Sequence, residues 1–172
     1  MPPAMQKWPD VPDCRGWLSL DRRGRWRLQG SPVEHAGLAD FIGQHYARHE
    51  SGAWFMQNGP QRVWVELAVT PWIFRFVDDR FMTHTGVPAG RIEAAWLVDG
   101  EQLCLQAECG PGLVDDRDLL TLFECIRRPD GTLPDDPGAE TVLCLHWNGN
   151  ALPLQRCTDA ELETLGAFRR VP

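Results

Sequence analysis

The segment WLSLDRRGRWRL (residues 17–28) has the pattern of a β-hairpin. Leu18 and Leu20 alternate with other residues before the turn sequence DRRG, and Trp26 and Leu28 resume the alternation after it. A three-residue loop that ends in a left-handed glycine joins strands of this kind. The register that follows places Leu20 opposite Trp26 and Leu18 opposite Leu28 on one apolar face. Turn chemistry and apolar pattern therefore predict the same hairpin.

Two later segments repeat this combination with two-residue turns. Asp99-Gly100 and Asn148-Gly149 each stand between short apolar runs, and both dipeptides favour the type I′ turn that matches the twist of a hairpin. The predicted cross-strand partners are Trp96 with Leu103, Ala94 with Leu105, Leu145 with Leu152, and Leu143 with Leu154. These patterns predict three antiparallel hairpins.

A helix is predicted after each hairpin. Ser31 and Glu34 form a capping box, so the first helix should begin there and end near residues 50–52. His45 and His49 would lie one turn apart on this helix, a spacing that can bind a metal ion. Because the sequence supplies no third ligand, we interpret these residues as structural histidines and predict neither a metal site nor a cofactor.

The other two helices have equally local signals. The acidic residues Asp115, Asp116 and Asp118 favour a helix start, and Pro129 ends that helix. Thr158 and Glu161 form a second capping box, which predicts a third helix near the C-terminus. Proline and glycine make residues 129–140 the clearest surface loop.

Together these patterns predict an α+β fold of mostly antiparallel β-hairpins with about three short helices. The expected organisation is an extended lead-in at 1–16, one domain at 17–172 with sub-units at 17–90 and 91–172, a β-rich stretch at 54–77, and hairpin-plus-helix units near 17–50, 94–128 and 142–170. The units share few residue identities. An internal repeat and an unrelated series of hairpins therefore stay open as alternatives.

The composition is that of an ordinary globular domain. The 172 residues are 43% hydrophobic and 24% charged, so a self-sufficient core is expected. The net charge of −7 argues against nucleic-acid binding, which depends on clustered cations. No apolar run reaches the roughly 18 residues of a membrane span, and the N-terminus lacks the apolar core of a signal peptide. We therefore expect a cytoplasmic protein with reduced cysteines and neither a nucleic-acid nor a membrane partner.

The segment QNGPQRVWVEL (residues 57–67) supplies the candidate binding surface. In a simple two-residue hairpin Pro60 would have to donate the closing hydrogen bond, so we expect a wider, more open loop. In the following strand the valines should face the core. Trp64 beside Arg62 should then face solvent, and such a pair is common in recognition surfaces. The alternative is that a helix covers Trp64 while Arg62 pairs with Glu66.

Cys109 represents an enzymatic alternative. It precedes Gly110-Pro111-Gly112 between a strand and a helix, where a helix N-terminus could lower a thiol pKa or bind a phosphate. Pro111 removes one N–H donor, and the acidic residues that follow oppose both roles. No Ser-His-Asp, Walker or dinucleotide pattern is present. We therefore predict no catalytic residue and keep a small cysteine- or metal-assisted hydrolase as the alternative to a binding module.

The chain resembles an uncharacterised proteobacterial family of domains of unknown function in four segments: WLSLDRRGRW (17–26), WFMQNGPQRVWVEL (54–67), TPWIFR (70–75) and HTG (84–86). The spacing of the first half is similar, more weakly, to a second such family, which is built from repeated structural motifs and proposed for signal transduction. The resemblance covers nearly the whole chain and implies a compact two-part α+β protein. It implies no established activity, cofactor or catalytic residue.

These observations predict a non-enzymatic module that binds a small ligand or a protein, in a regulatory or signalling role. The open Asn-Gly-Pro loop beside a strand of mixed aromatic and charged residues is the main reason. The candidate binding residues are Asn58, Gln61, Arg62, Trp64, Trp72, Arg75 and His84.

Overall fold

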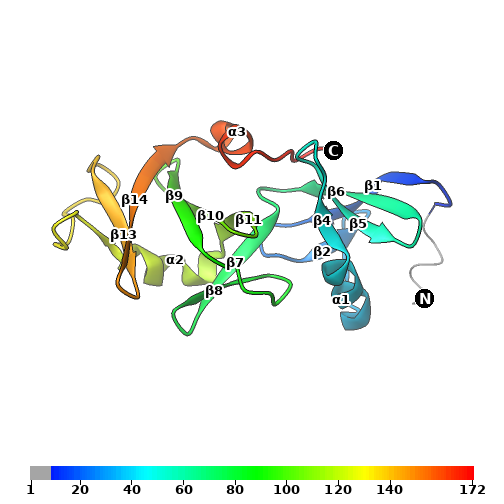
Figure 1. Ribbon diagram of the computed structural model, residues 1–172, viewed down its shortest axis with the longest axis horizontal. Helices are drawn as coiled ribbons and strands as arrows, with labels where there is room; N and C mark the ends of the chain where they lie inside the picture. Colours follow the sequence, from blue (N-terminus) through cyan, green and yellow to red (C-terminus); the bar gives the residue numbers. More distant parts are fainter. Residues whose placement is uncertain (1–8) are drawn as a thin grey trace. The chain divides into compact units, whose positions relative to one another are not determined.

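The computed structural model describes residues 9–172 and divides the chain into two compact units (Figure 1). Unit 1 holds the described residues up to Pro71 together with Ala167–Pro172, and unit 2 is Trp72–Gly166. The chain therefore leaves unit 1 once and returns to it with its last six residues. The sub-unit boundary expected near residue 90 falls inside unit 2.

Unit 1 is built around a six-stranded sheet. Its elements are β1 (Asp13–Leu20), β2 (Trp26–Leu28), β3 (Ser31–Pro32), α1 (Ala36–Gln44), β4 (Tyr46–Arg48), β5 (Trp54–Asn58) and β6 (Gln61–Leu67). The strand order is β3-β2-β1-β6-β5-β4, in which only β1 and β6 are parallel neighbours. β1 includes residues 13–16 of the predicted lead-in, and residues 1–8 lie outside the described part of the chain.

Unit 2 is built around an eight-stranded sheet. Its elements are β7 (Trp72–Val77), β8 (Arg80–Thr83), β9 (Ile92–Val98), β10 (Gln102–Ala107), β11 (Gly110–Val114), α2 (Asp116–Phe123), β12 (Ile126–Arg127), β13 (Leu143–Trp147), β14 (Asn150–Cys157), the 3₁₀ helix η2 (Asp159–Glu161) and α3 (Leu162–Gly166). The strand order is β12-β13-β14-β9-β10-β11-β7-β8, with β14 parallel to β9 and β11 parallel to β7.

The described chain is therefore α+β and dominated by strands, as predicted, although both sheets are mixed. Hairpins account for the antiparallel pairs, and the parallel pairs join strands that are far apart in the sequence. No helix among the described residues is long and apolar enough to cross a membrane.

Two of the three predicted hairpins have the predicted register. The pairs that are present are Leu18–Leu28, Leu20–Trp26, Leu143–Leu154 and Leu145–Leu152. Gly24 ends the first loop with a φ of 76°, and Asn148 and Gly149 form the other turn with φ values of 46° and 74°. These left-handed values are those that glycine and asparagine tolerate best, so the turn residues select the register.

The register of the middle hairpin differs from the prediction by one residue. Trp96 lies opposite Cys104, not opposite Leu103, and the pair predicted for Ala94 shifts in the same way. The Asp-Gly dipeptide does adopt left-handed φ values of 51° and 73°, but Glu101 adds an extra residue before pairing resumes. Both faces of this hairpin are buried, so a slip exposes no apolar side chain and alternation cannot specify the register.

The first helix is shorter than predicted at both ends. Ser31 lies in β3 and pairs with β2, so the predicted capping box does not start a helix. The N-cap of α1 is His35, whose Nδ1 accepts the N–H of Leu38 at 3.2 Å. The chain enters β4 directly after the helix, so His45 and His49 do not share a helical face. Sheet pairing, a tertiary contact, has overridden the local capping signal.

The other two helices begin where the sequence predicts. Asp115 accepts the N–H of Arg117 at 2.9 Å at the start of α2. Thr158 and Glu161 form the predicted capping box before η2 and α3. α2 ends at Phe123 and β12 begins at Ile126, so this helix is shorter than the prediction that Pro129 ends it.

An aromatic cluster lies in the core of unit 1. The Tyr46 ring centroid is 4.9 Å from those of Trp26 and Trp54. The Tyr46 hydroxyl donates to the carbonyl of Pro71 at 2.7 Å, and burial raises the pKa of Tyr46 well above its ordinary value. β5 and β6 send alternate residues into this core, which leaves the residues between them on the opposite, outer face of the sheet.

Candidate functional site

The β5–β6 hairpin holds the predicted binding segment, and its turn is tighter than predicted. Asn58 lies opposite Gln61, so the two turn residues are Gly59 and Pro60. Gly59 has a φ of 56°, which suits the first position of such a turn. Because Pro60 is inside the turn, it need not donate the closing hydrogen bond. The prediction of a wide, open loop is therefore wrong.

β6 shows the predicted alternation but not the predicted exposure of Trp64. Val63 and Val65 are fully buried, and Trp64 lies on the other face, opposite Phe55 of β5. Only 5% of the Trp64 surface is accessible, so the prediction that this indole faces solvent is wrong. The alternative ion pair is also absent, because Arg62 contacts rings and no carboxylate within the described residues.

Two guanidinium groups lie on this indole. The Cζ of Arg15 is 4.7 Å from the Trp64 ring centroid, and the Cζ of Arg62 is 5.3 Å from it. Arg62 is also 4.8 Å from the ring of Phe55, and the ring of His49 meets the indole edge-on at 5.2 Å. These distances are typical of cation–π contacts, in which a positive charge faces the π-electrons. We call these five residues the guanidinium–indole cluster.

Parallel pairing of β1 and β6 assembles the cluster. Asp13 lies opposite Arg62, and its Oδ1 accepts the Nε1–H of Trp64 at 3.1 Å. Arg15 comes two residues later on the same strand. Strands in a parallel pair are necessarily far apart in the sequence, so no local sequence pattern can predict that they pair. Sequence reasoning therefore found Arg62 and Trp64 but missed Arg15.

Neither guanidinium of the cluster has an acidic partner in the described part of the chain. The side chains of Arg15 and Arg62 form no hydrogen bond or ion pair within residues 9–172, and the Nε of Arg62 is buried. By contrast, Arg75 binds Asp118 with an N–O distance of 2.6 Å. The chain has 24 acidic residues for 17 basic ones, so arginines without a carboxylate partner are notable. Their N–H groups can bind an anion from outside the described chain.

Asn58 and Gln61 stabilise the turn and the N-terminal segment. The Asn58 side-chain amide donates to the Gln61 side-chain carbonyl at 3.2 Å. The Gln61 amide in turn donates to the backbone carbonyl of Val11 at 2.8 Å. These bonds use the Asn58 amide N–H and both polar groups of the Gln61 side chain, so the two residues position the hairpin beside the cluster.

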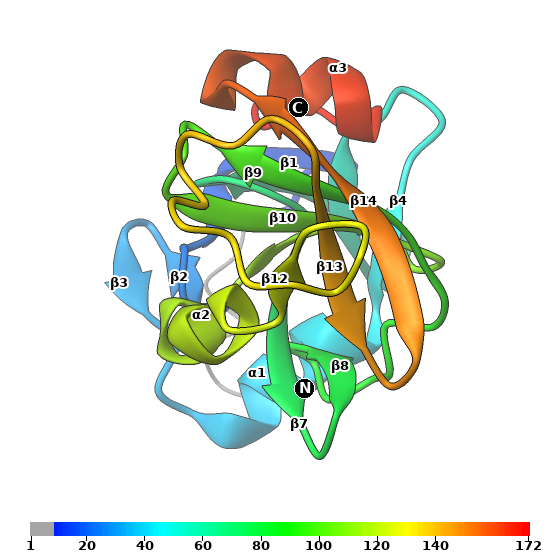
Figure 2. The same cartoon turned by 90° about the vertical axis from the view of Figure 1, so that its left-hand side faces the viewer.

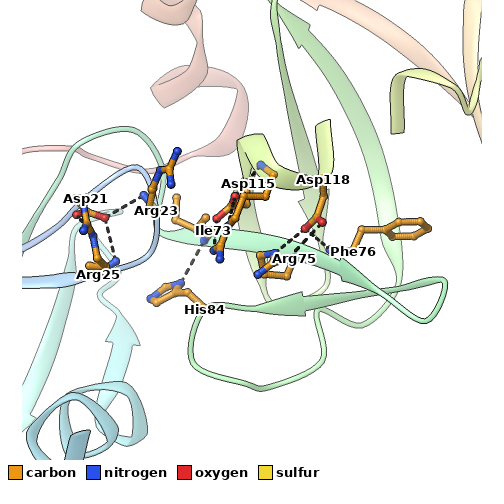
Figure 3. A network of polar contacts seen from close by, with 10 residues as sticks. Asp21, Arg23, Arg25, Ile73, Arg75, Phe76, His84, Asp115 and Asp118 are labelled. Carbon is orange, nitrogen blue, oxygen red and sulfur yellow. Dashed lines mark hydrogen bonds and ion pairs between the residues drawn. The ribbon is translucent and has the colours of Figure 1, made fainter. Parts of the chain in front are cut away.

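The other three predicted site residues belong to unit 2, and Figure 3 shows two of them, Arg75 and His84. The indole of Trp72 donates to a backbone carbonyl between β10 and β11 at 2.8 Å. His84 accepts the N–H of Ile73 through Nδ1 at 3.2 Å. The Asp118 carboxylate lies beside Arg75 and also accepts a backbone N–H of β7 at 3.0 Å. Each residue is fixed by contacts inside unit 2, while unit 1 alone forms the guanidinium–indole cluster.

Cys109 has few properties of a catalytic nucleophile. Burial raises the pKa of its thiol to about 11, so the reactive thiolate is scarce at neutral pH. Gly112, in the same glycine-rich run, is required for packing because a Cβ there would lie 2.3 Å from the ring of Phe74. Within residues 9–172, no three His, Cys, Asp or Glu side chains gather as metal ligands. The described residues give the hydrolase alternative no assembled site.

The family of this chain is established by a match over its full length. A family model named DUF2944, described as "Protein of unknown function (DUF2946)", matches residues 1–172, so the chain belongs to that family. This confirms the predicted resemblance to an uncharacterised family of domains of unknown function. No curated protein matches the chain.

Two solved structures are similar to this one. A DUF1285 family protein from Silicibacter pomeroyi DSS-3 aligns with a TM-score of 0.56 and 17% identity, over 90% of this chain and 87% of that one. A DUF1285 family protein from Shewanella baltica OS155 aligns with a TM-score of 0.49 and 15% identity, over 63% of this chain and 91% of that one. The first likeness shows a shared fold and nothing about activity.

Proposed function

We propose that this member of the DUF2944 family is a non-enzymatic binding module whose unit 1 recognises a carboxylate-rich segment of a protein partner. The supporting observation is the pair of guanidinium groups that lie on the Trp64 indole without a carboxylate among the described residues. A regulatory or signalling role and a cytoplasmic location belong to the same proposal.

An arginine stacked on an aromatic ring is prepared for an anion. The ring restrains the flat guanidinium, so less side-chain entropy is lost when its N–H groups bind a carboxylate in a bidentate pair. Stacking uses the face of the guanidinium and leaves the in-plane donors available. The Nε of Arg62 is buried, so an anion from outside would bind the terminal N–H groups of Arg62 and Arg15.

An acidic protein segment suits the shape of the cluster. Its members come from β1, β6 and β5, which are adjacent strands, and from His49 just after β4. The donors are therefore spread across a sheet face. An extended chain that crosses these strands can contact both arginines through carboxylates two residues apart, which lie on one side of such a chain, and charge complementarity favours glutamate and aspartate at those positions.

Binding of a fluorescein-labelled hexaglutamate peptide, followed by fluorescence anisotropy at low ionic strength, tests this proposal. We expect Arg15→Ala and Arg62→Ala each to weaken binding at least about tenfold, because each removes a charge-assisted bidentate contact. Arg22→Ala is the matched control, since Arg22 is an exposed arginine of the β1–β2 loop outside the cluster. An equal loss in the control, or no binding by the wild-type protein, would contradict the proposal.

Competition with citrate and with inorganic phosphate distinguishes a protein partner from a small ligand. We expect the peptide to be displaced only at much higher concentrations of either small anion. Displacement at equal concentration would assign a small-ligand site instead. Asn58 and Gln61 serve this face by positioning the turn, and Trp72, Arg75 and His84 stay predicted binding residues of unit 2.

We also infer that one structural arrangement occurs twice in the chain. Unit 1 has the order β3-β2-β1-β6-β5-β4, and β9 to β14 have the order β11-β10-β9-β14-β13-β12. In each set the strand that comes first in the chain is parallel to the strand that comes last, β1 to β6 and β9 to β14. Equivalent backbone bonds support this, because Gln57 donates to His45 at 3.0 Å and His146 donates to Cys125 at 2.9 Å. These observations favour two copies with β7 and β8 added, and the three-unit repeat stays a prediction.

A further inference from the structure

The sheet of unit 2 curls until its two end hairpins meet. β7–β8 and β13–β14 are separated in the strand order by β9, β10 and β11. Nevertheless, the Asn148 side-chain amide donates to the Asp79 carbonyl at 2.7 Å, and the rings of Phe81 and Trp147 lie edge to face at 5.8 Å. Figure 2 shows the tips of β8 and the β13–β14 hairpin close to each other. Curling of this kind creates a concave mouth where ligands commonly bind.

A cleft of about 420 Å³ lies at this seam. Its volume is within the range of small-molecule sites, roughly 300–1,000 Å³. Two aromatic rings contribute to its apolar lining, and arginine and asparagine side chains supply polar groups. The residues used below are Phe81, Trp147, Arg80, Arg91, Asn148 and Asn150. We call this site the seam cleft.

Backbone conformation and hydrogen bonds fix the walls of the seam cleft. Gly90 has a φ of 78°, and a Cβ there would lie 2.7 Å from the Glu108 carboxylate, so only glycine fits. Glu108 accepts the N–H of Arg91 at 3.2 Å and donates its own N–H to the Arg91 carbonyl at 2.8 Å. On the other wall, Asp78 and Asp79 have left-handed φ values of 51° and 58°. Such a preorganised site loses little entropy on binding.

Two guanidinium groups give the seam cleft a positive character. The side chain of Arg80 is exposed and forms no hydrogen bond or ion pair within residues 9–172. Arg91 pairs with Glu93 at 2.9 Å, but the arginine side chain is 74% exposed, so solvent screens this pair. Asp79 is the acidic residue in the lining, and its carbonyl rather than its carboxylate makes the contact across the seam. Two cations therefore face one anion in a chain whose net charge is −7.

We propose that the seam cleft binds a small organic anion with a flat apolar group, through a carboxylate or a phosphate. The apolar group lies against the half-buried ring of Trp147, which is itself supported by the buried ring of Phe81. The anionic group pairs with Arg80 and Arg91, and the Asn150 amide lies in the same lining. This site uses no residue of the guanidinium–indole cluster, so each proposal can be tested independently of the other.

Four probes that share a phenyl ring test the proposal: phenylacetate, phenyl phosphate, benzylamine and benzyl alcohol. Each is titrated into ¹⁵N-labelled protein, and the indole N–H resonance of Trp147, assigned with Trp147→Phe, is followed. We expect both anions to shift it with dissociation constants on the order of 1 mM, as for ligands of about ten heavy atoms. The tighter anion identifies the preferred group. The amine and the alcohol should bind at least about fivefold more weakly, because neither pairs with a guanidinium.

Two charge-removing variants assign the anion contacts. Arg80→Gln and Arg91→Gln should weaken both anions at least about fivefold and leave benzyl alcohol unchanged. Both side chains are exposed, so the fold should tolerate the changes, and Arg22→Gln in unit 1 is the matched control. Asn148→Ala should weaken all four probes alike, because it removes the contact that closes the seam.

Three results would overturn the proposal. The first is equal binding of the charged and neutral probes. The second is the absence of any Trp147 shift up to about 20 mM of either anion, well above the expected dissociation constant. The third is an equal loss of anion binding in Arg22→Gln and in the two cleft variants.

Discussion

The β5–β6 hairpin of unit 1 and the β13–β14 hairpin of unit 2 hold the same place in their strand orders but differ in chemistry. β6 carries Arg62 and Trp64, which build the guanidinium–indole cluster. Counted from the closing pair of each turn, β14 has Ala151 and Pro153 at those positions. Unit 2 instead adds the β7–β8 hairpin, whose tip completes the seam cleft.

The inward positions of the two hairpins are alike. Val65 of β6 and Leu154 of β14 are equivalent by the same count, and both are buried. Each lies opposite a buried apolar residue of the parallel neighbour, Leu18 in one case and Ala95 in the other. A shared core pattern therefore sets the strand arrangement, while a few outward positions and one added hairpin set the surface chemistry.

The largest expected effect comes from removing the indole that distinguishes β6. Trp64→Ala should lower the free energy of unfolding by about 3–5 kcal/mol, because it leaves a cavity under the two arginines. Urea unfolding followed by circular dichroism measures this. Pro153→Ala, at the equivalent exposed position of β14, is the control and should change stability by less than about 1 kcal/mol. Similar losses in both variants would show that the two positions are not different in role.

An intermediate effect is expected at the helices, which also hold equivalent places but have different caps. His35 caps α1, whereas Asp115 caps α2 and binds Arg117. Asp115→Ala should cost about 1–2 kcal/mol at pH 7. The exposed Asp40→Ala in α1 is the control and should change stability little.

The cost of Asp115→Ala should depend on pH. Its hydrogen bonds with Arg117 lower the pKa of Asp115 to about 2, whereas an unfolded aspartate titrates near about 3.9. Between these values the unfolded chain binds more protons, so the stabilisation is complete above pH of about 4 and is lost as the pH falls toward about 2. Urea midpoints of wild type and variant should therefore converge on acidification. A constant difference down to pH of about 2 would contradict the assigned shift.

The smallest effect on stability is expected for the arginines held by rings. Arg62→Ala should cost no more than about 1 kcal/mol, since Arg62 is only half-buried and a cation–π contact of this kind contributes about that much. Arg75→Ala should cost about 1–3 kcal/mol, because it leaves the part-buried Asp118 without its partner. Urea unfolding of both variants measures the two losses of stability. If Arg62→Ala costs as much as Arg75→Ala, the Arg62 guanidinium is structural and the acidic-partner proposal loses its basis.

The candidate sites were only partly predictable. Period-two alternation correctly separated Trp64 from the buried valines, but alternation identifies a face and not what lies on it. The covering arginine, Arg15, comes from a parallel neighbour that no local signal announces. The seam cleft escaped prediction for the same reason, because its walls are turns from the two ends of one sheet.

Local signals were sufficient to predict the register of the hairpins at residues 17–28 and 143–154 and the starts of the second and third helices. Turn residues such as Gly24 and caps such as Thr158 act within a few residues, so their effect can be read along the chain. Three features depend on the tertiary structure instead: Ser31 pairs with β2, the hairpin at Asp99 has a shifted register, and Arg15 covers Trp64. Each depends on contacts between distant segments, and their free energies exceed the weak local preferences that a sequence displays.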